Sequence, residues 1–227
     1  MHNYNMKATW DNITYTTDDA SFQWYINNGK AEPYPRELNI VKSYLNKYPH
    51  KNNLFIDVGG HIGTTSLPYS RLFKNVIAFE PNTVSYNFFL ENMKNNNINN
   101  VKVFNKGVFN KSTTCNIVKH GENSGCYYIA ECDKHEKSID VVRLDDLEYD
   151  LPVDFIKIDT EGSELFALEG AYNVIAKYKP LINLETNACS MKYFGYKKER
   201  IFEFLKALDY DVLDDDGNNP LFSHKEK

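Results

Sequence analysis

One stretch constrains the fold of this chain more than any other: Phe55–Gly63, which reads Phe-Ile-Asp-Val-Gly-Gly-His-Ile-Gly. A short apolar run ends in an acid, breaks into a glycine-rich turn and is followed by a segment that can be helical. Glycines let the backbone turn tightly and come close to a ligand, and the start of the next helix offers free N–H groups. The pattern is typical of the strand, turn and helix that open a nucleotide-binding α/β unit.

A second carboxylate, Glu80, ends the next apolar run along the chain. At the tip of the second strand it is placed to accept hydrogen bonds from ribose hydroxyls. The glycines do not form the dinucleotide pattern GxGxxG, because His61 and Thr64 stand where that pattern needs glycine. The turn therefore favours a ligand without phosphates, which contacts the backbone at Gly59 and places Asp57 near a cationic or amino-bearing group. S-adenosylmethionine has that chemistry.

Apolar runs alternate with helical repeats along most of the chain, which predicts a mostly parallel sheet with helices on both faces. We expect core strands at residues 54–58, 75–79, 101–104, 154–158 and 181–184, and helices at 35–48, 64–73, 83–95, 161–177 and 196–208. Residues 210–213 and 221–223 predict an antiparallel C-terminal hairpin. Residues 113–119 and 138–144 alternate like strands and predict an insertion hairpin after the third strand.

The length of 227 residues fits one α/β domain with an N-terminal extension. We expect the extension, or lid, at residues 1–50 and the α/β domain at residues 51–227. Within the extension, Thr14–Thr17 and Phe22–Ile26 predict a small hairpin ahead of the first helix. Its scattered aromatic residues fit either a packing flap or a lid over an active site.

Charge, hydropathy and cysteine usage exclude several classes of protein. The net charge of −5 leaves no global basic field for a long nucleic acid. No apolar run is long enough to span a bilayer, and the polar N-terminus lacks a signal-peptide core, so we expect a cytoplasmic protein. The four cysteines have no CxxC spacing and predict reduced thiols, with a Cys126–Cys132 disulfide as the alternative in an oxidising compartment. None of these features predicts the oligomeric state.

Several segments together share their sequence with one known family. They are Phe55–Gly63 (FIDVGANIG in the family), Ala78–Asn82, Asn123–Gly125, Val142–Leu147, Phe155–Glu164, Leu168–Ala171 and Lys179–Leu181. Through them, residues 35–187 resemble the FkbM-type family of class I S-adenosylmethionine-dependent methyltransferases. The main departure is Gly60-His61, where the family usually has Ala-Asn.

The resemblance implies a Rossmann-like class I methyltransferase fold that binds S-adenosylmethionine. It also implies transfer of the methyl group to a hydroxyl of a sugar, a glycan or a glycosylated natural product, and hence a carbohydrate or glycoconjugate partner. The residues expected to bind the cofactor are Asp57, Gly59, Gly60, Gly63, Glu80, Pro81, Asn82, Asn105 and Gly107.

Methyl transfer to a hydroxyl needs alignment and a group that takes or shares the hydroxyl proton. Asp159 fits this catalytic role, because it follows the fourth core strand and the cleft of an open parallel sheet lies at that edge. Lys157 points to the same side of the strand and is the second catalytic candidate. The alternative for Asp159 is a charge that favours the next helix N-terminus. His61 is either a base beside the methyl group or a polar residue that donates within the turn.

Four residues are candidates for substrate binding: Asn123, Ser124, Glu161 and Glu185. Asn-Ser-Gly is also ordinary turn chemistry, and Glu161 has the helix-dipole alternative. Glu185 ends the fifth core strand, where it could join Asp159 in holding a divalent ion or a substrate hydroxyl. We do not favour the metal, because a sequence does not show whether several oxygens converge.

Three other functions stay open as alternatives. An RNA ribose 2'-O-methyltransferase would use Lys157, Asp159 and Glu185 as a lysine–acid constellation, and the net charge opposes it. A nicotinamide-dependent oxidoreductase is opposed by the glycine positions. A non-catalytic nucleoside-binding module is opposed by the acids that follow three of the expected strands.

Overall fold

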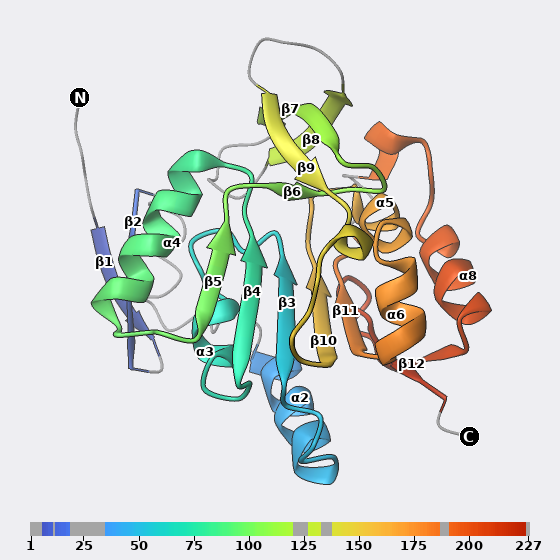
Figure 1. Ribbon diagram of the computed structural model, residues 1–227, viewed down its shortest axis with the longest axis horizontal. Helices are drawn as coiled ribbons and strands as arrows, with labels where there is room; N and C mark the ends of the chain where they lie inside the picture. Colours follow the sequence, from blue (N-terminus) through green and yellow to red (C-terminus); the bar gives the residue numbers. More distant parts are fainter. Residues whose placement is uncertain are drawn as a thin grey trace.

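The computed structural model describes residues 6–10, 12–18, 35–119, 127–132, 138–186 and 191–225. Within this part of the chain, the main sheet has seven strands in the order β12-β13-β11-β10-β3-β4-β5 (Figure 1). They are β3 (Leu54–Val58), β4 (Asn75–Phe79), β5 (Val101–Phe104), β10 (Val153–Ile158), β11 (Leu181–Leu184), β12 (Tyr210–Asp214) and β13 (Leu221–His224). The five strands from β11 to β5 are parallel, and β13 and β12 add an antiparallel hairpin at one edge. The expected strands and C-terminal hairpin are confirmed.

Helices cover both faces of this sheet. They are α2 (Pro35–Lys47), α3 (Ser66–Tyr69), α4 (Thr83–Asn95), α5 (Glu164–Glu169), α6 (Tyr172–Tyr178) and α8 (Glu199–Ala207), with 3-10 turns η1 (Leu144–Asp146) and η2 (Lys192–Phe194). Successive strand residues point to opposite faces, so Phe55 and Phe155 pack with α2, α3 and α4, whereas Ile56 and Ile156 pack with α5, α6 and α8. No helix among the described residues is both long and apolar enough to cross a membrane.

Two expected helices are shorter than their patterns suggested. The helix expected at 161–177 is divided into α5 and α6 at Gly170, where a Cβ atom would lie 2.1 Å from the carbonyl oxygen of Phe109. The helix expected at 64–73 is reduced to the single turn α3. Pro68 lacks an N–H, and the Ser70 hydroxyl donates to the carbonyl of Leu67 at 2.6 Å, so both residues compete with a regular helix.

A second sheet occupies the connection between β5 and β10. Its strands are β6 (Gly107–Val108), β7 (Thr113–Lys119), β8 (Tyr127–Cys132) and β9 (Ser138–Val142), in the order β6-β9-β7-β8. The expected β7–β9 pairing is confirmed, whereas β6 and β8 were not predicted. Figure 1 places this insertion sheet beyond the carboxyl ends of the parallel strands. Cys115 is disulfide-bonded, so the expectation of a reduced thiol is wrong at this position; β8 places Cys132 opposite it in register.

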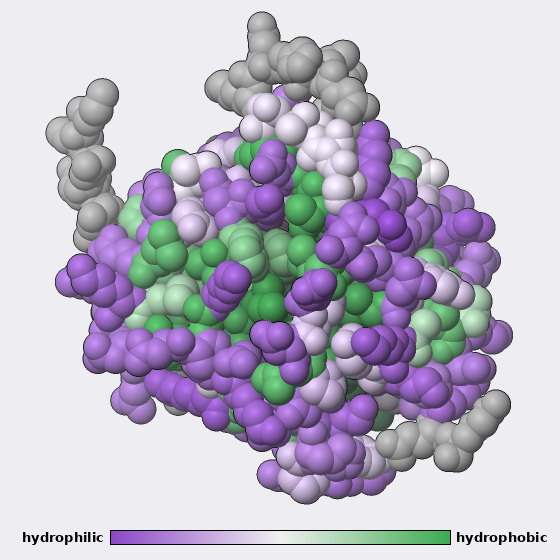
Figure 2. All heavy atoms as spheres, viewed as in Figure 1, coloured by the Kyte–Doolittle hydropathy of each residue, from purple (hydrophilic) through white to green (hydrophobic). Residues whose placement is uncertain are grey.

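Because this connection holds the insertion sheet and η1 in its described part, no α-helix follows β5 there. On the face of the molecule seen in Figure 2, apolar residues gather across the middle, with hydrophilic residues around them. Partly buried hydrophobic residues that pack against the core beneath include Ile77, Phe104 and Leu147.

The N-terminal hairpin consists of β1 (Met6–Trp10) and β2 (Ile13–Thr17). The expected strand near Thr14–Thr17 therefore exists, but it pairs with residues upstream, and Phe22–Ile26 lies outside the described residues. Asn92 of α4 and the C-cap residue of that helix, Asn96, hold β2. Asn96 exchanges two hydrogen bonds with the backbone of Thr14, both 2.8 Å, and Asn92 exchanges two with the backbone of Thr16, at 2.6 and 3.2 Å.

Candidate active site

Three polar side chains lie side by side near the carboxyl edge of the sheet. The strand register pairs Lys157 of β10 with Asp57 of β3 on one side and with Asn183 of β11 on the other. All three are buried, with Asp57 fully shielded and Lys157 4% exposed. Charges are rarely buried in this way without a partner or a function.

Asp57 carries a buried oxygen that the protein does not satisfy. Its Oδ2 accepts a hydrogen bond of 2.6 Å from the Ser66 hydroxyl, whereas Oδ1 has no partner among the described residues. Burial raises the pKa of Asp57, and the nearby charge of Lys157 opposes this shift. An orphaned carboxylate oxygen at this depth fits a ligand that brings its own donor, and an ammonium group is the strongest such donor.

The glycine turn admits no other residue at its two ends. Gly59 has φ +86, and a Cβ atom there would lie 1.8 Å from the carbonyl oxygen of Asp159. Gly63 has φ +93, and its Cβ would lie 2.3 Å from Leu67 Cδ1. The turn after β3 therefore packs directly against the backbone of the turn after β10.

The departure from the family sequence at positions 60 and 61 has a structural explanation. A Cβ atom on Gly60 would lie 2.8 Å from Cε1 of Phe89, so the phenyl ring occupies the space that alanine would use. His61 has φ 49, in the left-handed region where asparagine, aspartate and histidine are enriched. Histidine, like the family asparagine, is a residue type that tolerates this backbone conformation. Its predicted catalytic role stays a prediction.

Glu80 links the glycine turn to the end of β4. Its Oε2 accepts from the backbone N–H of His61 at 2.8 Å, and its Oε1 accepts from the backbone N–H of Asn82 at 2.7 Å. Burial raises the pKa of Glu80 to about 7, against the lowering effect of these two hydrogen bonds. Each oxygen still has a free lone pair, which a ligand hydroxyl can use.

Other predicted cofactor residues support this loop. Asn82 is the N-cap of α4 and accepts from the backbone N–H of Val84 at 2.9 Å. Asn105 donates to the carbonyls of Glu80 and Pro81 at 2.9 and 3.0 Å. These contacts fix the backbone after β4, where Glu80 is presented.

The roles expected for Gly107, Asn123 and Ser124 stay predictions. Gly107 lies in β6, and its Cα faces side chains of the insertion sheet, including Val141. Its expected contact with the cofactor is therefore not supported by its neighbours. Asn123 and Ser124, expected to bind substrate, lie outside the described residues.

The turn after β10 presents Asp159 beside a buried cation. Lys157 Nζ donates to Asp159 Oδ2 at 2.9 Å, which confirms that both point to the same side of the strand. The backbone N–H of Asp159 donates to the carbonyl of Val58 in β3 at 2.9 Å. The Asp159 backbone is thereby fixed against the strand that leads into the glycine turn.

Asp159, Glu161 and Glu185 come together, with one oxygen of each within 4.8 Å of the others. The negative charge of Asp159, followed by burial and the charge of Glu161, raises the pKa of Glu185 to about 10. Glu185 Oε2 is buried without a hydrogen-bond partner in the described structure. Such a group of oxygens can share a proton, anchor a substrate hydroxyl or hold a hard cation. Glu161, which was not among the expected metal ligands, belongs to this group.

Two residues near this turn were not predicted for the site. Glu164 is 1% exposed and accepts hydrogen bonds from the turn through its carboxylate, and the Tyr196 hydroxyl contacts the same turn. For Glu164 the segment Glu-Gly-Ser-Glu allows a functional role, but stabilisation of the helix dipole is the stronger interpretation of the sequence.

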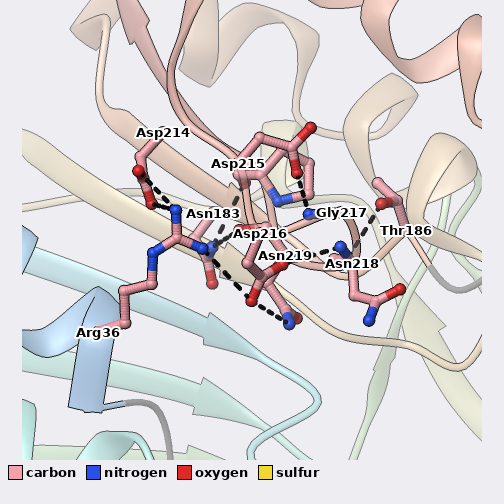
Figure 3. A network of polar contacts seen from close by, with 10 residues as sticks. Arg36, Asn183, Thr186, Asp214, Asp215, Asp216, Gly217, Asn218 and Asn219 are labelled. Atoms are coloured by element: carbon pink, nitrogen blue, oxygen red, sulfur yellow. Dashed lines mark hydrogen bonds and ion pairs between the residues drawn. The ribbon is translucent and has the colours of Figure 1, made fainter.

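Figure 3 shows the tip of the β12–β13 hairpin next to Thr186, which follows Glu185 in the chain. The carbonyl of Asn218 accepts hydrogen bonds of 2.6 Å and 3.0 Å from the backbone N–H and the hydroxyl of Thr186, next to Glu185. Arg36, in the first turn of α2, pairs with Asp214 at 2.6 Å and with Asp216 at 3.8 Å. The hairpin tip is therefore held on one side by the residue after Glu185 and on the other by α2.

Comparisons with known proteins agree with this geometry. A family model described as the methyltransferase FkbM domain matches residues 57–212. A curated protein named Methyltransferase 1, from Beauveria bassiana (strain ARSEF 2860), is 27% identical over 184 residues, which cover 68% of this chain and 73% of that protein.

Two solved structures share the fold. A methyltransferase FkbM from Methylobacillus flagellatus KT is similar with a TM-score of 0.52 at 21% identity, over 77% of this chain and 44% of that chain. The T. thermophilus 16S rRNA N2 G1207 methyltransferase (RsmC), in complex with AdoMet and guanosine, gives a TM-score of 0.51 at 14% identity, over 97% and 50% of the two chains. This chain therefore spans no more than half of either solved chain, and the likeness shows a Rossmann-like class I methyltransferase fold.

Proposed function

We propose that this chain, which belongs to the FkbM methyltransferase family, transfers the methyl group of S-adenosylmethionine to a hydroxyl of a sugar, a glycan or a glycosylated natural product. The observation that carries the proposal is the contact between Gly59 and the carbonyl of Asp159. It places the turn that would hold the cofactor against the residue that would meet the acceptor hydroxyl.

The residues present fit the cofactor. When bound, S-adenosylmethionine supplies an electrophilic methyl group on a sulfonium sulfur. Asp57 Oδ1 is the buried acceptor for its ammonium group, and Glu80 has lone pairs left for the ribose hydroxyls. Gly59 and Gly63 keep the backbone of the turn free of side chains.

The chain's own residues then align the acceptor and manage its proton. The hydroxyl oxygen forms the new O–CH3 bond while the S–CH3 bond breaks, and the hydroxyl proton must leave. The Asp159 carboxylate takes or shares that proton. Lys157, with its ammonium bound to Oδ2, orients the carboxylate, and Glu185 beside it anchors the acceptor.

The charge of the site supports a neutral acceptor. One oxygen of each of Asp159, Glu161 and Glu185 lies within 4.8 Å of the others, and Lys157 is the cation bound to Asp159. Carboxylates at an acceptor site disfavour a phosphate-rich substrate, and carboxyl groups, including the protonated one of Glu185, exchange hydrogen bonds with a polyol.

Two measurements test the proposal. Calorimetry with S-adenosylmethionine and S-adenosylhomocysteine should show binding of both, and no detectable binding of either would contradict the proposed cofactor. Incubation with methyl-labelled cofactor and a panel of glycans should then transfer label to one acceptor class. The same assay with EDTA separates a hydroxyl anchor, which is unaffected, from a metal site at Asp159, Glu161 and Glu185, which loses activity.

An RNA ribose hydroxyl is the second candidate acceptor. The observation that favours it is the bond from Lys157 to Asp159 with Glu185 alongside, which matches the lysine–acid constellation expected for that reaction. A gel shift with short single-stranded and hairpin RNAs tests it. Tight binding at physiological salt would favour RNA over a glycan.

A further inference from the structure

The turn after β10 has a backbone that needs support. Glu161 has φ 55 and Gly162 has φ 109, so two successive residues lie in the left-handed region. A non-glycine residue held there is strained, and it persists only where surrounding contacts determine it. The turn carries both Asp159 and Glu161, so its support decides where two carboxylates of the candidate site lie.

Glu164 provides most of that support from inside the protein. Its Oε1 accepts from the backbone N–H of Thr160 at 3.0 Å, from the Thr160 hydroxyl at 3.2 Å and from the backbone N–H of Gly162 at 2.9 Å. The two backbone donors flank Glu161. One carboxylate oxygen therefore bridges the residues on either side of Glu161, whose backbone is strained.

Tyr196 adds support from a distant part of the chain. Its hydroxyl donates to the carbonyl of Gly162 at 2.8 Å and accepts from the backbone N–H of Leu165 at 3.2 Å. It also lies 3.2 Å from Glu164 Oε2, and its ring packs edge-on against Phe166. The hydroxyl thus connects the turn, the start of α5 and the Glu164 carboxylate.

We propose that Glu164, assisted by Tyr196, is a positioning residue that holds the turn of Asp159 and Glu161 in the geometry required for methyl transfer. Glu164 is buried behind the turn and its hydrogen bonds are to backbone, to the Thr160 hydroxyl and to Tyr196, so it acts through its neighbours and does not meet the substrate. The catalytic readout of this proposal rests on the proposed function.

Hydrogen exchange tests the support without any substrate. In Glu164→Ala the amides of Thr160 and Gly162 should exchange about tenfold faster or more, because they lose their acceptor. Glu164→Gln keeps an acceptor oxygen toward the turn and can donate to the Tyr196 hydroxyl, so its exchange should match the wild type. Glu169→Ala is the matched control, since Glu169 is exposed at the other end of α5, where its carboxylate accepts a hydrogen bond from the Asn110 side chain.

Kinetics with the best glycan acceptor then separate positioning from folding. Glu164→Ala should lower kcat about a hundredfold with the Kd for S-adenosylmethionine within about twofold of the wild type, because a small displacement of Asp159 affects only the reacting geometry. Tyr196→Phe, which removes one donor, should lower kcat about three- to tenfold. Glu164→Gln should restore kcat to within about threefold of the wild type.

Each outcome decides the proposal. Unchanged exchange of Thr160 and Gly162 in Glu164→Ala would overturn it, as would an unchanged kcat. A parallel loss of kcat and cofactor binding in Glu164→Ala, not rescued by glutamine, would assign Glu164 to folding alone. If the wild type methylates no acceptor, the proposed function fails, and the exchange experiment still decides whether Glu164 holds the turn.

Discussion

The turn after β3 and the turn after β10 are built alike. Each contains a non-glycine residue in the left-handed region, His61 in the first and Glu161 in the second, and a glycine with positive φ. A buried glutamate binds the backbone of each turn. Glu80 accepts from the N–H of His61 in the first, and Glu164 accepts from the N–H groups of Thr160 and Gly162 in the second. The same solution to a strained turn therefore occurs twice at one edge of the sheet.

The two glutamates differ in what remains available to a ligand. Glu80 directly follows the neighbouring strand β4, and each of its oxygens accepts one backbone hydrogen bond. Glu164 lies in the helix after its own turn. One of its oxygens accepts three hydrogen bonds, and the Tyr196 hydroxyl lies beside the other oxygen. One arrangement leaves a surface for binding, and the other is closed and serves as support. Both glutamates are buried, so burial does not show which of them can bind a ligand; the lone pairs left free on the carboxylate do.

The largest effect is expected where the two turns touch. Gly59→Ala would place a Cβ atom 1.8 Å from the Asp159 carbonyl and would strain a backbone with φ +86. Both turns would move, so turnover should fall by about a thousandfold or more, with weakened cofactor binding. Steady-state kinetics and calorimetry measure this.

Gly217→Ala is the control for that substitution. Gly217 has φ +95 but nothing within 4 Å of an added Cβ atom, so it carries the conformational cost without the collision. Turnover of Gly217→Ala should stay within about threefold of the wild type. If Gly59→Ala behaved like Gly217→Ala, the two turns would not be mechanically connected.

The next effect separates the chemistry of the second turn from the binding of the first. Asp159→Asn should lower kcat about a hundredfold while the Kd for S-adenosylmethionine stays within about twofold, because the carboxylate acts on the acceptor proton. Asp146→Asn, which removes a surface pair with Arg143 at 3.5 Å, is the control. Unchanged turnover in Asp159→Asn would remove Asp159 from the mechanism.

A smaller effect is expected from Glu80→Gln. The new amide would place an NH2 group against one of the two backbone donors, so the Kd for S-adenosylmethionine should weaken about tenfold at pH 8. Because burial raises the pKa of Glu80 to about 7 and ligand hydroxyls favour the ionised form, wild-type affinity should fall as the pH drops below 7. The variant should lose this pH dependence in calorimetry between pH 6 and pH 8. A retained dependence would assign it to another group.

The same raised pKa has a consequence for stability. Glu80 holds its proton more tightly in the folded state than in the unfolded state, so its contribution to the free energy of unfolding is full below about pH 4.5 and is lost as the pH rises through about 7.

The smallest effect is expected at Glu185. The charge of Asp159 raises its pKa to about 10, so Glu185 destabilises the folded state increasingly between about pH 4.5 and pH 10. At pH 8 the Glu185 carboxylate must take up a proton when the chain folds, and Glu185→Gln removes this cost. The substitution should raise the Tm at pH 8 by about 2 to 4 °C in differential scanning calorimetry. The exposed Glu148→Gln should leave the Tm unchanged. A lower Tm for Glu185→Gln would contradict the acid repulsion.

The sequence predicted the elements that depend on local pattern. The parallel strands were recognisable because strands buried on both faces are almost continuously apolar. An acid at or directly after the carboxyl end of such a strand has to lie at the sheet edge. Asp57, near the end of β3, and Glu80 and Asp159, directly after β4 and β10, were therefore placed correctly relative to their strands.

The features that it missed depend on contacts between distant residues. Tyr196 looked like the start of a helix, and nothing local connects it to Gly162, 34 positions earlier. The short strand β6 and the strand β8 obtain their pairing from β9 and β7, not from their own composition. The disulfide at Cys115 likewise depends on register, which cysteine spacing does not reveal.

Asn92 of α4 and the C-cap residue Asn96 cover the outer edge of β2 in the N-terminal hairpin. A strand at the edge of a sheet offers unpaired N–H and C=O groups that a second molecule can use for pairing. On the side of β2 away from β1, Asn92 and Asn96 already bind the donors and acceptors of Thr16 and Thr14. A helix thus presents two amides where another strand would present its backbone. Loss of these two side chains would expose the edge, and the consequence would be self-association and poor solubility.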